Sequence, residues 1–326
     1  MNKVKLSPKP ILVRNLLLIE GITRSGKFLV GNILDGLERV EHYQYAAILE
    51  HLPYMLKMRI ISEEVAISFL QNTVDEYSCH QLIGRNMNFR VSDLSSLARS
   101  PRLAEYRKRM TATIDALQII KNFTEGNFYN PFIVHEGMPN INLFFKAYPQ
   151  IQIISIQRHP VDLIHSWYSR GLGEKEVSDP LSFQPCLEVS RVSVPWYLTP
   201  VARNYYKMPR IDRVIFAIKN LYDLSCKMYG ELSPKHKKQI LFITFENLTQ
   251  NSLTVVKQMA HFLQTEPVSA MSKILARERC PRLTNVEERG KRIEAIRKKS
   301  SEKLFKDMMH LATIYEQKGG ELWLTR

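Results

Sequence analysis

The chain has little cysteine and no long apolar run, and each absence excludes a class of protein. Its four cysteines are far apart in 326 residues and include no C-x-x-C pair: Cys79, Cys186, Cys226 and Cys280. This spacing argues against a zinc ribbon and against a dithiol redox motif, so we expect free thiols in a reducing compartment. No apolar stretch approaches the ~20 residues that a membrane-spanning helix needs, and no cleavable signal pattern is evident. We therefore predict a cytoplasmic protein without a transmembrane segment.

The rest of the composition is that of a globular protein with an excess of positive charge. Hydrophobic residues make up 44% of the chain, which is enough for a large core. The 46 Lys and Arg residues outnumber the 32 Asp and Glu residues, so the formal net charge is +14. This excess favours an anionic partner such as a nucleotide, an acidic glycan, a nucleic acid or a membrane surface. Charge alone does not choose among these, and it is also compatible with simple solubility.

Residues 16–28, L-L-L-I-E-G-I-T-R-S-G-K-F, have the layout of a phosphate-binding loop. The apolar run at 16–19 is typical of a buried strand, and apolar residues recur at helical spacing from Leu29 onward. Between them, two glycines bracket a basic turn made of Gly21, Thr23, Arg24, Ser25, Gly26 and Lys27. In such a strand–turn–helix unit, backbone N–H groups and the positive end of the helix face an anion.

The turn nearly satisfies the P-loop pattern G-x-x-x-x-G-K-[ST], but Phe28 stands where the pattern requires Ser or Thr. That hydroxyl normally holds the magnesium ion of a nucleoside triphosphate. The loop is therefore suited to phosphate and poorly suited to a metal. We predict a phosphate-containing donor that needs no magnesium, and no metal site.

Strand-like and helix-like segments alternate along the chain. Apolar runs predict buried strands at residues 132–134, 151–157 and 239–245, with a shorter strand at 40–43. Helical spacing predicts helices at residues 211–229 and 292–315. This alternation predicts an α/β fold with a parallel β-sheet covered by helices on both faces.

We predict a single domain over residues 1–326, with a mostly helical insertion at about 55–125. Residues 172–209 are expected to be irregular and residues 280–291 to form a basic loop. Ligands of a parallel sheet bind beyond the carboxyl ends of its strands. This rule places residues 21–27, 135–137 and 158–159 and Glu246 along one rim.

Residues 151–171, I-Q-I-I-S-I-Q-R-H-P-V-D-L-I-H-S-W-Y-S-R-G, place Arg158 at a strand end and Ser166 two helical turns later. Together with the turn at 21–28, this stretch resembles the sulfotransferases that use 3′-phosphoadenosine 5′-phosphosulfate (PAPS). The resemblance is nearer to the glycan and bacterial branch than to the cytosolic small-molecule branch. The stretch L-F-I-T-F-E-N-L-T-Q-N-S is similar to the family's late strand and Glu-containing turn. The resemblance implies a P-loop nucleotide-binding, sulfotransferase-like fold and PAPS as donor.

The resemblance also implies roles for individual residues. The 5′-phosphosulfate would contact Thr23, Arg24, Ser25, Gly26, Lys27 and Phe28, and the 3′-phosphate would contact Arg158 and Ser166. Arg24 takes the place of the Lys or Arg that the family commonly has beside the leaving group. Lys27 and Phe28 replace hydroxyl residues that are common in the family, and Lys27 can supply positive charge instead. Sulfuryl transfer needs such a cation, hydrogen-bond donors around the sulfate and a base on the acceptor hydroxyl.

The general base has five candidates, Glu41, His42, Glu50, His135 and Glu136. Many glycan sulfotransferases use a Glu downstream of the first loop, whereas the small-molecule branch uses a His after the third strand. Gly137 stands at about the position of that His here. We therefore predict that Glu50 is the base, with a pKa raised by burial so that it can accept a proton. His135 is the next catalytic candidate.

These features predict an enzyme, a sulfotransferase that moves a sulfuryl group from PAPS to a hydroxyl of a carbohydrate or related metabolite. An acidic glycan is a candidate acceptor, and no nucleic-acid partner is expected. One alternative is a P-loop kinase or nucleotide triphosphatase, which Phe28 disfavours. Another is a non-catalytic protein that binds polyanions, which the net charge does not separate from an enzyme. Arg282, Arg289, Gly290 and Lys291 could close over the 3′-phosphate or form a solvated basic face.

Overall fold

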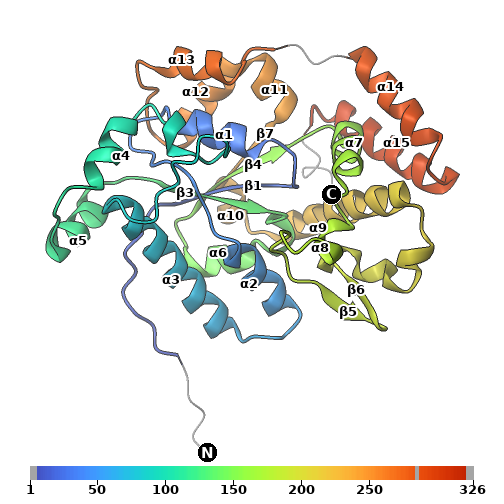
Figure 1. The fold of residues 1–326 in the computed structure, drawn as a ribbon, viewed down its shortest axis with the longest axis horizontal. Helices are drawn as coiled ribbons and strands as arrows, with labels where there is room; N and C mark the ends of the chain where they lie inside the picture. The colour runs from blue at the N-terminus through green and yellow to red at the C-terminus, as the bar shows by residue number, and fades with distance from the viewer. Residues whose placement is uncertain (1–5, 283–285, 321–326) are drawn as a thin grey trace, which may run out of the picture.

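A five-stranded parallel sheet forms the centre of the molecule (Figure 1). The computed structural model describes residues 6–282 and 286–320. The strands lie in the order β2, β3, β1, β4, β7, and every neighbouring pair is parallel. Their bounds are Leu16–Gly21 (β1), Gln44–Tyr45 (β2), Asn130–His135 (β3), Gln152–Gln157 (β4) and Ile240–Thr244 (β7).

The side chains of the sheet divide between two hydrophobic cores, because successive residues of a strand point to opposite faces. In β1, Leu16 and Leu18 join one core, whereas Leu17 and Ile19 join the other. All four side chains are fully buried. A strand that is covered on both faces therefore reads as a continuous apolar run in the sequence.

Helices cover both faces of the sheet (Figure 1). The core on one face is completed by α1 (Lys27–Leu34), α12 (Ser252–Phe262) and α13 (Met271–Arg277). The core on the other face is completed by α2 (Ile48–Lys57), α3 (Glu63–Leu82), α6 (Asn142–Ala147), α7 (Pro160–Arg170), α9 (Arg210–Glu231) and α15 (Glu302–Gln317). The predicted α/β fold with a parallel sheet between helices is confirmed.

Shorter elements complete the described chain. The remaining helices are α4 (Leu103–Arg109), α5 (Ala116–Glu125), α8 (Lys175–Ser178), α10 (Pro234–Lys238), α11 (Phe245–Gln250) and α14 (Val286–Arg297). There are also the hairpin β5 (Leu187–Val189) and β6 (Val192–Val194) and the 3₁₀ segments η1 (Leu97–Arg99), η2 (Met138–Asn140) and η3 (Trp196–Lys207). Within residues 6–282 and 286–320, no helix combines the length and the apolar character needed to cross a membrane.

The predicted strands at 16–19, 132–134, 151–157 and 239–245 correspond to β1, β3, β4 and β7. The prediction of a strand at 40–43 is wrong, since β2 begins at Gln44 and Val40 makes only an isolated bridge. The predicted irregular segment at 172–209 contains α8, the β5–β6 hairpin and η3. The single-domain assignment and its insertion at 55–125, where α4 and α5 lie, stay predictions.

The prediction of one helix over 292–315 is also wrong. Two helices, α14 and α15, occupy this region and are separated after Arg297. Ser301 takes the extended backbone of an N-cap residue, and its N–H donates to Asp212 Oδ1 over 2.9 Å. Serine favours this position because it suits helix starts better than helix interiors. The basic loop expected at 280–291 is partly helical from Val286, and its residues 283–285 lie outside the described residues.

Candidate active site

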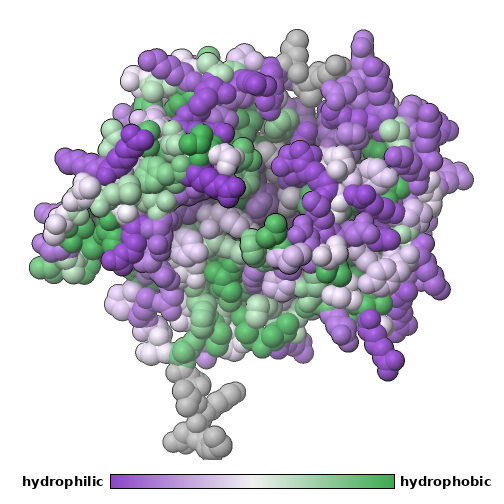
Figure 2. Space-filling view, in the orientation of Figure 1, coloured by the Kyte–Doolittle hydropathy of each residue, from purple (hydrophilic) through white to green (hydrophobic). Residues whose placement is uncertain are grey.

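The strand order places the loop between β1 and α1 at a topological switch point. The chain passes from β1 to β2 and β3 on one side of it, and then to β4 and β7 on the other side. In open parallel sheets, the crevice at such a point is where ligands bind. Residues 22–26, called here the β1–α1 loop, follow the carboxyl end of β1 and face this crevice. In Figure 2 a hollow opens near the middle of the visible face, in the region of this loop.

The β1–α1 loop has backbone geometry that only glycine allows at two positions. A Cβ atom at Gly21 would lie 2.4 Å from the carbonyl oxygen of Ile156, and one at Gly26 would lie 2.7 Å from the ring of Phe245. Gly26 has a φ of 113°, in the left-handed region that favours glycine. It is the N-cap of α1 and provides no side-chain hydrogen bond. The first N–H groups of α1 therefore suit an anion.

Ser25 and Thr23 extend this anion-binding geometry. Ser25 is only 1% exposed, and its hydroxyl has no hydrogen-bond partner among the described residues. The Thr23 N–H donates to Glu136 Oε1 over 2.6 Å, and the indole of Trp167 donates to the Thr23 carbonyl over 2.7 Å. These contacts hold the loop in place while the buried Ser25 hydroxyl stays unpaired. A buried hydroxyl without a partner is costly, so it fits a ligand that accepts its hydrogen bond.

Three arginines gather beside the loop around Ser166. Arg24 Nε and Arg170 Nη1 each lie 3.4 Å from Ser166 Oγ, and Arg158 Nη1 donates to the Arg24 carbonyl over 2.9 Å. Burial lowers the pKa of Arg24, and the nearby charges of Arg170 and Arg158 lower it further. Burial lowers the pKa of Arg158 too. An anion bound beside Arg24 would offset the repulsion that Arg170 and Arg158 exert on its guanidinium group. The structure thus brings Arg24, Arg158 and Ser166 together, and it adds Arg170, which sequence reasoning missed.

A cavity of about 460 Å³, called here the rim cavity, opens in front of the loop. Of the predicted donor-binding residues, it is lined by Thr23, Arg24, Gly26, Lys27, Phe28 and Arg158. Phe245 and Arg282 also line it, and both Arg158 and Arg282 lie over the Phe245 ring, with centroid distances of 4.6 and 5.4 Å. Phe245 was missed, although it directly follows β7 and the strand-end rule could have found it.

Lys27 lies inside the loop rather than extending across the cavity. Its Nζ donates to the carbonyl oxygens of Gly21, over 2.6 Å, and Ile22, over 3.1 Å. Burial lowers the pKa of Lys27 to about 8, although the carboxylates of Glu136, Glu50 and Glu20 oppose that shift. In this position Lys27 ties the two ends of the turn together.

Glu50 and His135 form a hydrogen-bonded pair beside the loop. Glu50 Oε1 accepts from the His135 N–H over 2.7 Å and lies 2.5 Å from His135 Nδ1, while Tyr45 donates to Oε2 over 3.1 Å. Burial alone would raise the pKa of Glu50, but the charge and hydrogen bonds of His135 lower it below its ordinary value. The expectation that burial raises this pKa is therefore wrong, because the partner outweighs desolvation.

His135 lines two cavities. It borders the rim cavity, and it also borders a small pocket of about 10 Å³, called here the inner pocket, with Glu50, Pro53, Gln184 and Trp196. The Nδ1–H of His135 is directed to a carboxylate, so the neutral ring keeps its lone pair on Nε2. With its proton on Nδ1, His135 would present Nε2 as a general base.

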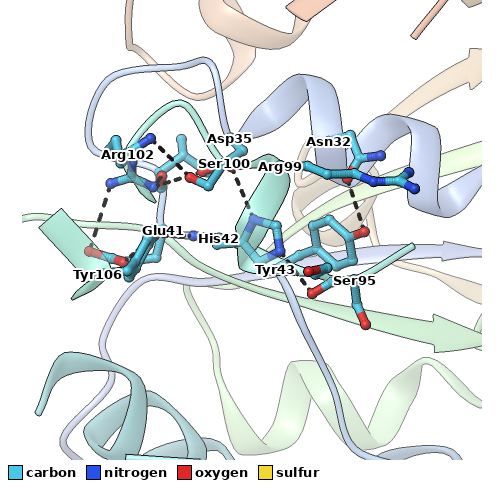
Figure 3. Close-up of polar contacts among 12 residues, drawn as sticks. Asn32, Asp35, Glu41, His42, Tyr43, Ser95, Arg99, Ser100, Arg102 and Tyr106 are labelled. Atoms are coloured by element: carbon cyan, nitrogen blue, oxygen red, sulfur yellow. Dashed lines mark hydrogen bonds and ion pairs between the residues drawn. The ribbon is translucent and has the colours of Figure 1, made fainter. Parts of the chain in front are cut away.

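The other base candidates are engaged elsewhere. Glu136 holds Thr23. Glu41 accepts from Tyr106 over 2.8 Å and from Arg109, and His42 Nδ1 lies 3.0 Å from Asp35 Oδ2 (Figure 3). Neither Glu41 nor His42 lines the rim cavity.

These buried groups belong to a network that supports one side of the rim cavity (Figure 3). Arg102 Nη2 donates to Asp35 Oδ1 over 3.1 Å, and His42 Nε2 lies 3.2 Å from the Ser95 carbonyl. The Tyr43 hydroxyl lies 3.0 Å from Asn32 Oδ1 and 2.5 Å from the Leu94 carbonyl. Asn32 and Leu94 both line the rim cavity, so the network holds residues 94–102 against α1.

The basic residues near the C-terminus divide in their roles. Arg282 lines the rim cavity, whereas Arg289 and Arg292 each donate to Asp162 of α7 over 2.8 Å. Glu246 accepts from the His159 N–H over 3.0 Å and from the Tyr315 hydroxyl over 2.6 Å. These pairs fasten α14 to α7 and α15 to α11. No group of three or more His, Cys, Asp or Glu side chains among the described residues could hold a metal ion.

Comparison with known proteins identifies one family. A family model described as "Sulfotransferase domain" matches residues 17–308. The sulfotransferase domain of the Synechococcus PCC 7002 olefin synthase is 12% identical, with a TM-score of 0.47, over 96% of this chain and 98% of that chain. The sulfotransferase domain from the curacin biosynthetic pathway is 12% identical, with a TM-score of 0.43, over 79% of this chain and 77% of that chain. Mouse sulfotransferase SULT7A1 complexed with PAP is 14% identical, with a TM-score of 0.31, over 81% of this chain and 64% of that chain. No curated protein matches the sequence.

Proposed function

The chain belongs to the sulfotransferase family, and from that premise we propose that it transfers a sulfuryl group from PAPS to a hydroxyl of a carbohydrate or related metabolite. The observation that carries the proposal is the arginine cluster at Ser166, beside a glycine-bracketed loop with an unpaired hydroxyl. The positive charges of Arg170 and Arg158 beside Arg24 and the buried Ser25 Oγ without a partner both fit a phosphosulfate donor.

The donor would be held by residues that converge on the rim cavity. Backbone N–H groups at the start of α1 and the Ser25 hydroxyl suit the phosphosulfate end. Arg158 and Ser166 suit the 3′-phosphate, and Phe245 offers a flat apolar face. PAPS supplies the activated sulfuryl group. Arg24 follows Thr23 in the loop and lines the rim cavity, so it can neutralise the charge that develops on the departing 5′-phosphate.

We assign proton removal to His135, with Glu50 as its positioning residue. His135 borders the rim cavity, so its ring can reach a hydroxyl of an acceptor that enters this cavity beside the donor. Nε2 of His135 accepts the hydroxyl proton, and the carboxylate of Glu50 stabilises the imidazolium that forms.

A P-loop kinase is the main alternative, and Phe28 speaks against it. The Phe28 ring packs against Tyr43 at 5.9 Å and lies 6.3 Å from His135. An apolar ring therefore occupies the position from which a hydroxyl would hold magnesium. A protein that only binds polyanions would have no need for the pairing of His135 with Glu50.

Calorimetric titration with adenosine 3′,5′-bisphosphate in the absence of magnesium tests the proposal. We expect a dissociation constant on the order of 10 µM or below, as is usual for a nucleotide substrate. Arg158→Ala should weaken binding at least about tenfold, because it removes a charge-assisted contact. Lys235→Ala, an exposed lysine on α10 at the opposite edge of the sheet, is the matched control and should bind normally. No binding at high micromolar ligand, or magnesium-dependent hydrolysis of ATP, would overturn the assignment.

A further inference from the structure

A second cavity, of about 320 Å³, lies away from the rim cavity. It is bounded by the C-terminal part of α3, by α4 and α5 and by the starts of β1 and β3. Arg14, just before β1, and Asn130, the first residue of β3, both line it. We call it the distal cavity. The six residues of β1 separate it from the β1–α1 loop, a distance of roughly 17 Å.

The walls of the distal cavity are mainly apolar, with one unsatisfied hydroxyl. Leu82, Ile114, Phe123 and Phe128 contribute apolar surface. Ser78 also lines the cavity, is only 2% exposed, and its Oγ has no hydrogen-bond partner in the described part of the chain. A buried hydroxyl beside apolar walls is stabilised when a bound molecule accepts its hydrogen bond.

The charged side chains on the wall are paired, with one exception. Arg109 donates to both carboxylate oxygens of Glu41, over 3.0 and 2.9 Å, and also contacts Glu105. Arg14 is exposed, and no acidic side chain within residues 6–282 and 286–320 forms an ion pair with it. The unpaired charge at this cavity is therefore positive.

Helix α5 forms the outer wall, and it is under-packed. None of its residues is buried, although it carries Leu117, which is 80% exposed, and Ile120, which is 50% exposed. In Figure 1 the helix lies at the left edge of the molecule, and Figure 2 shows apolar residues on the surface there. The inner side of α5 thus borders a cavity instead of a filled core, which is unusual in close-packed proteins.

We propose that the distal cavity is a second ligand site, which binds a small amphipathic anion such as a medium-chain carboxylate or an aryl sulfonate. The apolar body of the ligand packs between Phe123, Phe128 and Leu82. Its anionic group pairs with Arg14, and Ser78 donates a hydrogen bond to a polar atom of the ligand. This site is separate from the donor and acceptor positions, so a ligand here binds together with the nucleotide.

Two fluorescent probes that differ in charge test this site. We expect 8-anilinonaphthalene-1-sulfonate and the uncharged N-phenyl-1-naphthylamine to bind saturably, with dissociation constants below about 100 µM. Binding of both should persist in saturating adenosine 3′,5′-bisphosphate. A dye that the nucleotide displaces, or the absence of saturable binding, would overturn the proposal.

Three single-residue variants test whether the two dyes bind inside the distal cavity. Arg14→Gln, at an exposed position that is safe for folding, should weaken the sulfonate at least about fivefold and leave the uncharged dye within about twofold. Ser78→Met fills the cavity and should weaken both dyes at least about tenfold. Leu117→Ser, on the exposed side of α5, is the matched control and should change neither. Loss of binding in Leu117→Ser, or equal effects of Arg14→Gln on both dyes, would show surface binding and refute the site. If Ser78→Met does not fold, as judged by circular dichroism, the Arg14→Gln comparison decides.

Discussion

His135 and Glu50 show how a residue's role depends on its partner. Glu50 has a lowered pKa, which makes it a weak base, because His135 gives it a backbone and a ring hydrogen bond. The same contact orients the imidazole so that Nε2 keeps its lone pair. We therefore expect the two residues to contribute unequally to proton removal.

Substitution of each partner tests this inequality. His135→Gln should lower kcat about 10³-fold, because it removes the base, whereas Glu50→Gln should lower it about tenfold by releasing the ring. Nucleotide affinity, measured by calorimetry, should change little in either variant. If Glu50→Gln were the more damaging substitution, Glu50 would be the base.

Glu20, on β1, makes folding stability depend on pH. Burial raises its pKa to about 7, although Ser155 and the charge of Lys27 act against the shift. The folded protein then binds more protons than the unfolded chain between the ordinary pKa of 4.5 and about 7. The contribution of Glu20 to stability is therefore fully present below pH 4.5 and is lost as the pH rises through about 7.

The Glu20→Gln variant should remove this dependence. Urea titrations at about pH 5 and pH 7.5 measure this dependence. Between these two pH values, we expect the free energy of unfolding to fall by about 2 kcal/mol less in the variant than in the parent protein. Lys27 does not interfere, since its pKa is lowered only to about 8. Glu76→Gln, an exposed position on α3, serves as the control. Equal pH dependence in parent and Glu20→Gln would contradict the assignment.

At the scale of elements, the β1–α1 loop depends on the packing of a distant strand end. Gly26 has no room for a Cβ because the ring of Phe245, which follows β7, lies against it. Gly21 is restricted in the same way by the carbonyl of Ile156 in β4. The loop shape is thus set by three neighbouring strands as well as by its own sequence.

Two glycine substitutions separate this effect from helix propensity. Gly26→Ala should destabilise the fold by about 2 kcal/mol and weaken nucleotide binding, because its Cβ meets Phe245 at a φ of 113°. Gly230→Ala, in α9, has nothing within 4 Å of the new Cβ and should be neutral or stabilising by about 0.5–1 kcal/mol. Thermal unfolding and calorimetry measure both. Similar stability changes in the two variants would refute the steric argument.

For the whole molecule, the two hydrophobic cores share one sheet. Leu16 and Leu18 belong to one core and Leu17 and Ile19 to the other, so loss of β1 would disrupt both. The family match spans residues 17–308 as one unit. We therefore expect the chain to unfold as a single cooperative domain.

Differential scanning calorimetry should show one transition. Adenosine 3′,5′-bisphosphate at about 100 times its dissociation constant should stabilise the fold by about 2.7 kcal/mol and move the whole transition upward. Two transitions, of which only one responds to the nucleotide, would mean that residues 55–125 or another segment folds separately.

Sequence reasoning named most residues of the candidate site because their signals are local. The strand-to-loop change at Gly21 and the spacing of Arg158 and Ser166 are visible in short segments. Arg170 was missed because it joins the site only through the packing of α7, whereas Phe245 was missed although its place directly after β7 marks it as a strand-end residue. The break between α14 and α15 was missed because their apolar spacing continues across it, and the bond to Asp212 that marks it is long-range.

The sequence by itself determined the alternation of apolar strands and helices, the glycine-bracketed loop and the family. These follow from residue order, because burial on both faces demands apolar runs and a tight anion loop demands glycine. Only the tertiary structure decided which of the candidate bases faces the cavity. The pairing of β3 with β1 places His135 beside Gly21, and the packing of α2 against β3 places Glu50 next to His135. It also created the distal cavity, because α5, none of whose residues is buried, borders this space without filling it.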